Sequence, residues 1–166
     1  MLLTKIKSKD IKLSKTIERN PKISGINFDS RKIKKGMMFA AIRGKKNNGI
    51  EYCDKALKAG ANAILCNRKD LKKVIKKKTN ILTTNNVRLS VSLIIRKFFP
   101  KQPKNIVAIT GTNGKTSIAF YLKNIWKAAD ISYASIGTLG IIYENKKKPL
   151  DLTTPDPVTL YKEIDG

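Results

Sequence analysis

The segment from residue 106 to residue 117 constrains this chain more than any other part of its sequence. It begins with the apolar run Ile106–Ile109, continues through a turn that contains Gly111 and Gly114, and ends in Gly-Lys-Thr before a helical pattern starts. We expect the apolar run to be a buried strand. A glycine-containing turn between a strand and a helix lets backbone N–H groups approach an anion, and the helix N-terminus adds a partial positive charge. The segment therefore predicts a phosphate-binding loop.

The residues of this loop have separate expected roles. Lys115 would reach the terminal phosphates of a nucleotide, and the Thr116 hydroxyl would be a ligand for Mg²⁺. The general nucleotide-binding pattern has glycine where this chain has Ile109, so the loop is a shorter variant. The other interpretation is a strand, turn and helix that carry glycine and lysine without any ligand. On the first interpretation, the nucleotide is bound by Gly111, Thr112, Asn113, Gly114, Lys115, Thr116 and Ser117.

The strong positive charge of the chain invites another interpretation, namely binding to nucleic acid. The formal net charge is +23, because 35 Lys and Arg residues face 12 Asp and Glu residues. However, 29 of the basic residues are Lys and only 6 are Arg, and the densest Lys run, between residues 69 and 78, has no interleaved aromatic residues to stack on bases. We therefore expect a solvated basic surface and no specific nucleic-acid partner. A basic, non-enzymatic nucleic-acid-binding protein is the alternative from a different class.

Length and composition are those of a globular protein. With 166 residues, 41% of them hydrophobic and 28% charged, the chain is long enough for one good-sized domain or two small ones. It shows neither a signal-peptide core nor the roughly 20 apolar residues needed to span a membrane. Cys53 and Cys66 lack paired-ligand spacing, and without any His they argue against zinc and against a Cys-His catalytic pair. We expect a cytoplasmic monomer with buried, reduced thiols.

Hydrophobic periodicity predicts alternating strands and helices. We expect one strand that ends near Phe28 and others over 37–42, 61–66 and 79–84. We expect one helix that begins near Tyr52 and ends just before Gly60, and another over 87–98. A linker at 100–104 then separates residues 1–102 from residues 103–166. Beyond it, a helix and a strand at 132–138 would complete a βαβ unit with the 106–109 strand. The core stripe of that helix would be Ile118, Ala119, Leu122, Ile125, Trp126 and Ala129.

Short motifs in both halves resemble the Mur ligases, the ATP-dependent amide-forming enzymes of peptidoglycan synthesis. The loop at 110–116 is similar to their ATP-binding loop, which folylpolyglutamate and cyanophycin synthetases share. The motif at 28–31, with the glycines and apolar residues at 36–49 and 59–61, resembles their N-terminal UDP-binding domain. The motifs at 136–140 and 153–156 are similar to the members that add the third residue, the UDP-N-acetylmuramoyl-tripeptide synthetases. The resemblance covers residues 23–164.

This resemblance implies a fold and a set of site residues. The fold class would be α/β, with a small N-terminal α/β UDP-binding domain at 1–102 followed by the start of a P-loop-type parallel-sheet ATPase domain at 103–166. ATP and Mg²⁺ would be the cofactors, with Lys115 as the catalytic residue and Thr116 on the metal. Two alternatives are left open: Ser30 could cap a turn, and Thr153 and Thr154 could open a helix. The implied substrate-binding residues are Ser30, Lys45, Lys46, Thr153 and Thr154.

The implied activity is ATP-dependent formation of an amide bond. A carboxylate of UDP-N-acetylmuramoyl-dipeptide would be activated as an acyl phosphate and attacked by the amine of an incoming amino acid. Two departures limit the comparison. Leu152 stands where family members often have Asn, and the family's Mg²⁺-binding Glu, carbamylated Lys and C-terminal domain have no counterpart in this sequence. We therefore expect an N-terminal fragment without ligase activity of its own; another ligase of the same superfamily is the alternative within this class.

Overall fold

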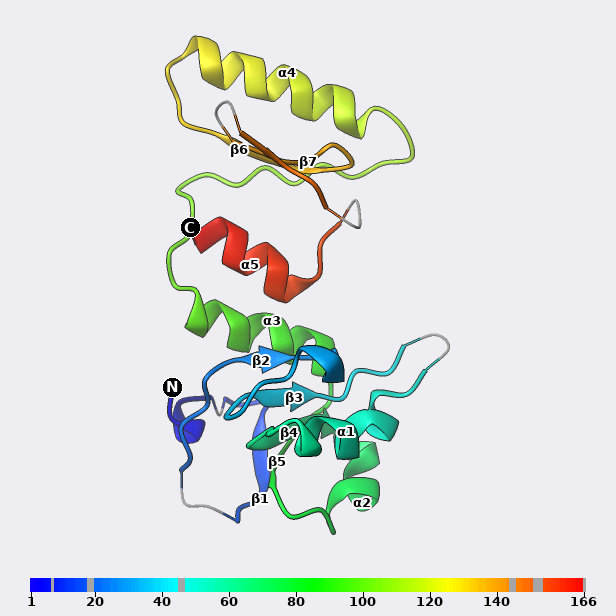
Figure 1. The fold of residues 1–166 in the computed structure, drawn as a ribbon. Helices are drawn as coiled ribbons and strands as arrows, with labels where there is room; N and C mark the ends of the chain where they lie inside the picture. Colours follow the sequence, from blue (N-terminus) through cyan, green and yellow to red (C-terminus); the bar gives the residue numbers. More distant parts are fainter. Residues whose placement is uncertain (7, 18–19, 45–46, 144–145, 151–153, 166) are drawn as a thin grey trace. The chain divides into compact units, whose positions relative to one another are not determined.

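The computed structural model divides into two compact units. It describes residues 1–166 except 7, 18–19, 45–46, 144–145, 151–153 and 166. The first unit comprises Met1–Lys101 together with the chain end from Asp165, and the second comprises Gln102–Ile164. The helices and strands of both units are labelled in Figure 1. Each unit is described separately below.

A five-stranded mixed sheet forms the centre of the first unit. Its strands are β1 (Lys12–Lys15), β2 (Ile26–Asn27), β3 (Met38–Ala40), β4 (Ala63–Asn67) and β5 (Asn80–Thr84). The order across the sheet is β1-β5-β4-β3-β2, with β2 to β5 parallel and β1 antiparallel at the edge beside β5. The four parallel strands were predicted from the sequence. The strand β1 was not among the strands that we expected.

Helices connect the parallel strands, as a parallel sheet requires. The α-helices are α1 (Cys53–Lys58), α2 (Leu71–Val74) and α3 (Val87–Phe98), and 3₁₀ helices cover Leu3–Ile6, Ser30–Lys32, Gly49–Tyr52 and Arg68–Asp70. The side chain of Asn86 accepts a hydrogen bond from the Leu89 amide and so caps the N-terminus of α3. Just beyond α1, Gly60 has a φ of 94°, a conformation that favours glycine.

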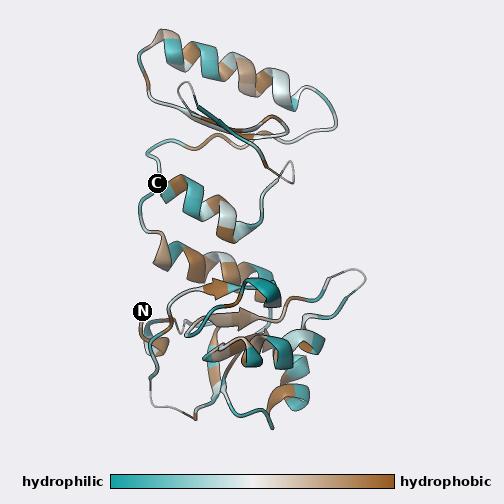
Figure 2. Cartoon of the chain, viewed as in Figure 1, coloured by the Kyte–Doolittle hydropathy of each residue, from teal (hydrophilic) through white to brown (hydrophobic). Residues whose placement is uncertain are grey.

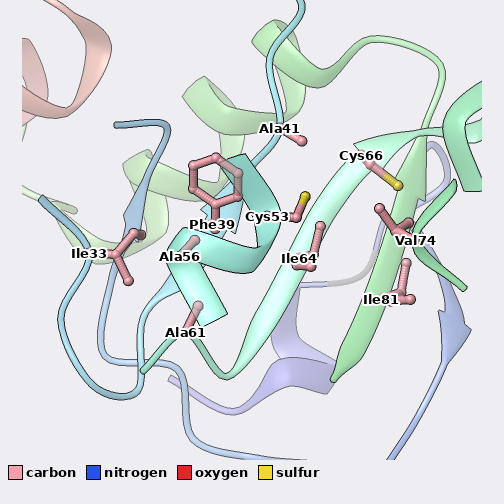
Figure 3. Packing of buried hydrophobic residues seen from close by; sticks show 10 residues of the cluster. All are labelled: Ile33, Phe39, Ala41, Cys53, Ala56, Ala61, Ile64, Cys66, Val74 and Ile81. Carbon is pink, nitrogen blue, oxygen red and sulfur yellow. The ribbon is translucent and has the colours of Figure 1, made fainter. Parts of the chain in front are cut away.

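Apolar side chains from one face of this sheet pack against α1 and α2. Phe39, Ile64 and Ile81 come from three neighbouring strands, and Ala56 and Val74 come from the two helices (Figure 3). On the other side of the sheet, α3 packs against β2, β4 and β5 (Figure 1). Because both faces are covered, the strands are buried along nearly their whole length, as is typical of parallel sheets.

The two cysteines belong to this core. Both Cys53 and Cys66 are free and buried, and burial raises the pKa of Cys53 to about 11 and the pKa of Cys66 to about 12. The thiolate is the reactive form of cysteine, so thiols with such pKa values are inert near neutral pH. The expectation of buried thiols is confirmed.

The second unit contains two helices and an antiparallel sheet. Its elements are α4 (Lys115–Ala128), β6 (Ala134–Gly137), β7 (Gly140–Tyr143), β8 (Lys146–Lys148) and α5 (Pro157–Asp165). The strands pair in the order β6-β7-β8, and β6 and β7 form a hairpin in which Gly137 faces Gly140. Together the two units give the expected mixed α/β class.

The expected strand at 106–109 is wrong for this structure. Residues 101–110 form no strand in the described part of the chain, and Ile106 is 63% exposed. The strand at 132–138 is present as β6, but it pairs with β7 in an antiparallel manner and not with residues 106–109 in parallel. An apolar segment becomes a strand only when neighbouring strands accept its backbone hydrogen bonds. In the described part of the second unit, no strand lies beside this segment.

The expected core stripe on α4 is also wrong for this structure. Ile118 is 48% exposed and Ile125 is 60% exposed, while Trp126 is half-buried. Figure 2 shows the apolar residues of α4 in brown along the helix. In the described part of this unit the only buried large apolar side chain is Ile141 of β7. The periodicity correctly predicted a helix, but a stripe becomes core only where other apolar surface covers it.

Candidate functional site

The loop between residues 110 and 115 is open on the surface of the second unit. Gly111 has a φ of 148° and Gly114 a φ of 77°, so both adopt backbone conformations that residues with a side chain rarely occupy. Thr112 and Asn113, between them, are exposed. A Cβ built on Gly114 would meet no atom of another described residue within 4 Å. The two glycines are therefore required by the backbone, and open space lies beside the second one.

The helix α4 begins directly after this loop. Gly114 occupies its N-cap position, and no side chain among the described residues caps that end. The first intrahelical hydrogen bond runs from the Ile118 amide to the Gly114 carbonyl, at 2.9 Å. The amides of residues 115–117 therefore precede the helical hydrogen-bond ladder, as the first amides of every helix do. Such a helix N-terminus attracts anions.

The ammonium group of Lys115 folds back onto this loop. Its Nζ donates to the carbonyl oxygens of Gly111 and Thr112, the latter at 3.2 Å. This places a positive charge beside the loop. Phosphate oxygens are stronger acceptors for an ammonium group than neutral carbonyls, so an anion bound in the loop could compete for Lys115. Thr116 and Ser117, in the first turn of α4, are exposed and therefore available as hydroxyl ligands.

A magnesium ion would have few protein ligands here. The Thr116 hydroxyl is an oxygen donor of the type that Mg²⁺ accepts, and Mg²⁺ commonly takes most of its remaining ligands from phosphates and water. Within the described residues, no group of three or more His, Cys, Asp and Glu side chains could hold a metal ion. The residues present thus fit a metal that arrives with a polyphosphate rather than one held in a protein cage.

The motif at 28–31 lies just beyond the carboxyl end of β2. Asp29 is the N-cap of a 3₁₀ turn: its Oδ1 accepts from the Arg31 amide at 2.9 Å, and its Oδ2 lies 2.8 Å from Arg31 Nη2. The hydrogen bonds from the Arg31 side chain lower the pKa of Asp29 to about 2. Ser30 is buried within this turn. The capping role that the sequence left open for Ser30 therefore belongs to Asp29.

The remaining expected substrate residues are only partly described. Lys45, Lys46 and Thr153 lie outside the described residues. Thr154 is exposed and precedes α5, which is capped by Asp156: the Asp156 Oδ1 accepts from the Val158 amide at 2.9 Å. The sequence had left open that the threonine pair starts this helix, and in the structure Asp156 has that role.

Apart from Thr154, the expected site residues that the structure describes lie in two places. Gly111 to Ser117 form one continuous loop and first helical turn on the second unit. Ser30 and Gly44 follow β2 and β3 at the carboxyl edge of the sheet in the first unit, where open α/β sheets bind ligands. Sequence reasoning missed the role of Asp29, although an Asp two residues before an Arg is a recognisable signal for a capped turn with an ion pair.

Each of the two units matches a model of a known protein family. A model described as "Mur ligase family, catalytic domain" matches residues 22–98, and a model described as "Mur ligase middle domain" matches residues 109–165. The chain belongs to the Mur ligase family. The order of the two matches agrees with the order of the two compact units in this Mur ligase chain.

Two curated relatives are similar to this Mur ligase chain over most of its length. A protein of Mesorhizobium japonicum is 37% identical over 89% of this chain and 30% of its own length, and one of Agrobacterium fabrum is 40% identical over 84% of this chain and 27% of its own length. Both are named UDP-N-acetylmuramoyl-L-alanyl-D-glutamate--2,6-diaminopimelate ligase. This Mur ligase chain thus spans about 30% of the length of the curated relatives it matches.

A solved structure supports the fold of the Mur ligase chain. It is also a UDP-N-acetylmuramoyl-L-alanyl-D-glutamate--2,6-diaminopimelate ligase, and it aligns with a TM-score of 0.76 over 99% of this chain and 33% of its own, at 23% identity. At that identity the comparison establishes the α/β fold alone. Among the described residues, no helix has both the length and the apolar character to cross a membrane.

Proposed function

We propose that this chain is the N-terminal part of a ligase that adds the third amino acid to UDP-N-acetylmuramoyl-dipeptide at the expense of ATP. The observation that carries the proposal is the loop from Gly111 to Ser117, in which two glycines with positive φ, a lysine and an exposed helix N-terminus occur together. Its relatives' printed names contain the muramoyl dipeptide and a diamino acid. Those names support the substrate class and do not decide which amino acid this protein takes.

In the proposed reaction the loop binds the phosphates of ATP, and Lys115 stabilises charge on the phosphoryl group as it moves to a substrate carboxylate. The amine of the amino acid then attacks the acyl phosphate, which forms the amide and releases phosphate. Mg²⁺, held by the phosphates and Thr116, would neutralise phosphate charge. The UDP part of the substrate would be held by Ser30 and by the loop at Lys45 and Lys46. The muramoyl-peptide part would be held by Thr153 and Thr154.

The proposal also concerns which part of the reaction these 166 residues carry out. Aligning the two reactants contributes on the order of 7 kcal/mol or more in well-oriented reactions. The relatives are more than three times as long as the part that they share with this chain. We therefore propose that these residues bind nucleotide and do not form the amide alone. We also propose that the protein is cytoplasmic and monomeric. The free thiols of Cys53 and Cys66 fit a reducing compartment.

Replacing Lys115 tests the nucleotide site directly. We expect Lys115→Ala to weaken ADP and ATP binding at least tenfold, because a charge-assisted hydrogen bond to phosphate is lost. Isothermal titration calorimetry on the 166-residue protein measures this change. The matched control is Lys127→Ala, which removes the same charge from the far end of α4. Equal affinities of Lys115→Ala and the unmodified protein would contradict the assignment of the loop.

A further inference from the structure

The chain contains two Asn-Gly pairs, and the structure places them in opposite environments. They are Asn48-Gly49, at the start of the 3₁₀ helix before α1, and Asn113-Gly114, directly before α4. An asparagine followed by glycine readily loses its side-chain amide, because no side chain on the glycine hinders the approach of the backbone nitrogen. The sequence alone gives both pairs the same reactivity, so the fold must decide which of them reacts.

The first pair is held by hydrogen bonds and packing. The Asn48 side-chain oxygen accepts from the Ile50 amide at 3.3 Å, and the Gly49 amide donates to the Ile42 carbonyl at 3.0 Å. Gly49 is buried, and a Cβ built there would lie 2.6 Å from the backbone of Ile42. The Gly49 nitrogen and the Asn48 side chain therefore cannot approach each other unless these contacts break.

The second pair is open. Both Asn113 and Gly114 are exposed, and a Cβ built on Gly114 would meet no atom of another described residue within 4 Å. Among the residues that the structure describes, none forms a hydrogen bond with the Gly114 amide or with the Asn113 side chain. The two reacting groups are thus free to approach each other, and water can reach both.

Positive charge beside the second pair favours the reaction. The attacking nitrogen loses its proton and carries negative charge as it approaches the side chain. Gly114 is the N-cap of α4, where the helix dipole places a partial positive charge. The ammonium group of Lys115 lies beside the same loop, since its Nζ donates to the Thr112 carbonyl at 3.2 Å. Both charges stabilise the anionic nitrogen.

We propose that Asn113 is a site of spontaneous deamidation, and that the carboxylate formed there ends nucleotide binding by the loop. The Gly114 amide loses its proton, and its nitrogen forms a bond to the Asn113 Cγ. The Cγ–Nδ2 bond breaks, and the side-chain nitrogen leaves with a proton as ammonia. Water then opens the cyclic imide, at one carbonyl to give aspartate and at the other to give isoaspartate. Water is the co-reactant, and no group is oxidised or reduced.

The consequence for the nucleotide rests on the proposed function. Asn113 lies within the loop from Gly111 to Ser117, so a negative charge on it repels the phosphates that the loop amides attract. Isoaspartate also adds a methylene group to the main chain and so displaces the amides that follow it. Conversely, bound phosphates accept hydrogen bonds from the loop amides and keep the Gly114 nitrogen protonated. Nucleotide binding and deamidation therefore oppose each other.

Peptide mapping of the 166-residue protein tests the modification site. After incubation in mildly alkaline buffer, trypsin releases residues 105–115, which contain Asn113, and residues 47–55, which contain Asn48. Mass spectrometry with fragmentation identifies which amide has become an acid, and an unincubated sample corrects for conversion during digestion. In the folded protein Asn113 should convert at least about tenfold faster than Asn48, because Asn48 reacts only after local unfolding. In urea the two should convert at similar rates.

The consequence for nucleotide binding has its own measurements. ADP with Mg²⁺ should slow conversion at Asn113 and leave the rate at Asn48 unchanged. Asn113→Asp should raise the Kd for ADP, measured by calorimetry, at least about tenfold. The matched control is Asn48→Asp, which adds the same charge to the other unit and should leave the Kd for ADP unchanged.

The outcomes that would overturn the inference are distinct. Equal conversion of the two asparagines in the folded protein, or faster conversion of Asn48, would remove the structural selection. An Asn113 that stays intact while the urea-unfolded chain converts would show that the folded loop prevents the reaction. Unchanged ADP affinity of Asn113→Asp would remove the consequence for binding. If the unmodified protein does not bind ADP, the proposed function and this consequence both fall, while the conversion rates still decide the modification site.

Discussion

At the scale of single residues, acidic side chains are few, and several of them have a defined contact. Asp29 caps a turn and pairs with Arg31, Asp70 holds Arg43 and Lys73, and Asp156 caps α5. In a chain with 12 acidic and 35 basic residues, an unpaired acid would be attracted by many cations, so a specific contact requires geometry as well as charge. The N-cap position supplies that geometry for Asp29 and Asp156.

The Asp29 contact makes stability depend on pH in the acid range. Its pKa is lowered from 3.8 to about 2, so the contact stabilises the fold fully above pH 4 and this contribution is lost as the pH falls through about 2. Arg31 is exposed, so solvent screening keeps this contribution small. In urea unfolding, the stability difference between the unmodified protein and Asp29→Asn should shrink from pH 5 to pH 2. A difference that is constant over this range would contradict the ion pair.

At the scale of elements, backbone geometry decides where helices end. After α1, the Gly60 amide donates to the Leu57 carbonyl at 2.9 Å, and the Gly60 carbonyl accepts from the Gly36 amide at the same distance. A Cβ at Gly60 would lie 2.9 Å from the Cα of Lys35. The positive φ and the neighbouring backbone therefore both require glycine at this position.

Substitution of Gly60 measures this requirement. Gly60→Ala should lower the free energy of unfolding by about 2 kcal/mol, since a left-handed conformation costs roughly 1–2 kcal/mol and the contact with the Lys35 backbone adds to it. Gly25→Ala is the control, because its Cβ would approach only the flexible end of the Met37 side chain and its φ is not positive. Equal effects of the two substitutions in urea denaturation would show that Gly60 is not special.

The sequence predicted elements well where local and tertiary forces agree. The parallel strands of the first unit are rich in apolar residues and are buried on both faces, and α3 has apolar residues at helical spacing and an Asn cap, so pattern and structure coincide. The prediction failed at Ile106–Ile109 and on the apolar face of α4, where periodicity identifies apolar surface but cannot supply the strands and helices that would cover it. The Arg43–Asp70 contact was not predictable, because residues 27 positions apart meet only through the sheet topology.

At the scale of the whole molecule, apolar burial is concentrated in the first unit. In the part of the chain that the structure describes, Ile141 is the only buried hydrophobic residue beyond Ile95. Burial of apolar surface is the main favourable term in folding. The first unit therefore has most of the stabilising core, and the second unit has apolar residues, such as Ile106 and Ile125, that remain exposed.

Limited proteolysis tests this difference. Brief digestion with trypsin should cut first beyond residue 101 and leave a fragment that begins at Met1 and ends near Lys101, because the second unit opens more readily to the protease. Mass spectrometry identifies the fragment. Early cuts at Lys55 or Lys73, with the second unit intact, would contradict this distribution of stability.

The central claim is that the residues from Gly111 to Ser117 bind the phosphates of a nucleotide. Its most direct test is a titration of the ¹⁵N-labelled 166-residue protein with ADP and Mg²⁺, followed by amide chemical shifts. We predict saturable shifts that are largest at Gly111, Gly114, Lys115 and Thr116. Shifts spread over the surface lysines in proportion to ADP concentration, with none concentrated in this loop, would contradict the claim.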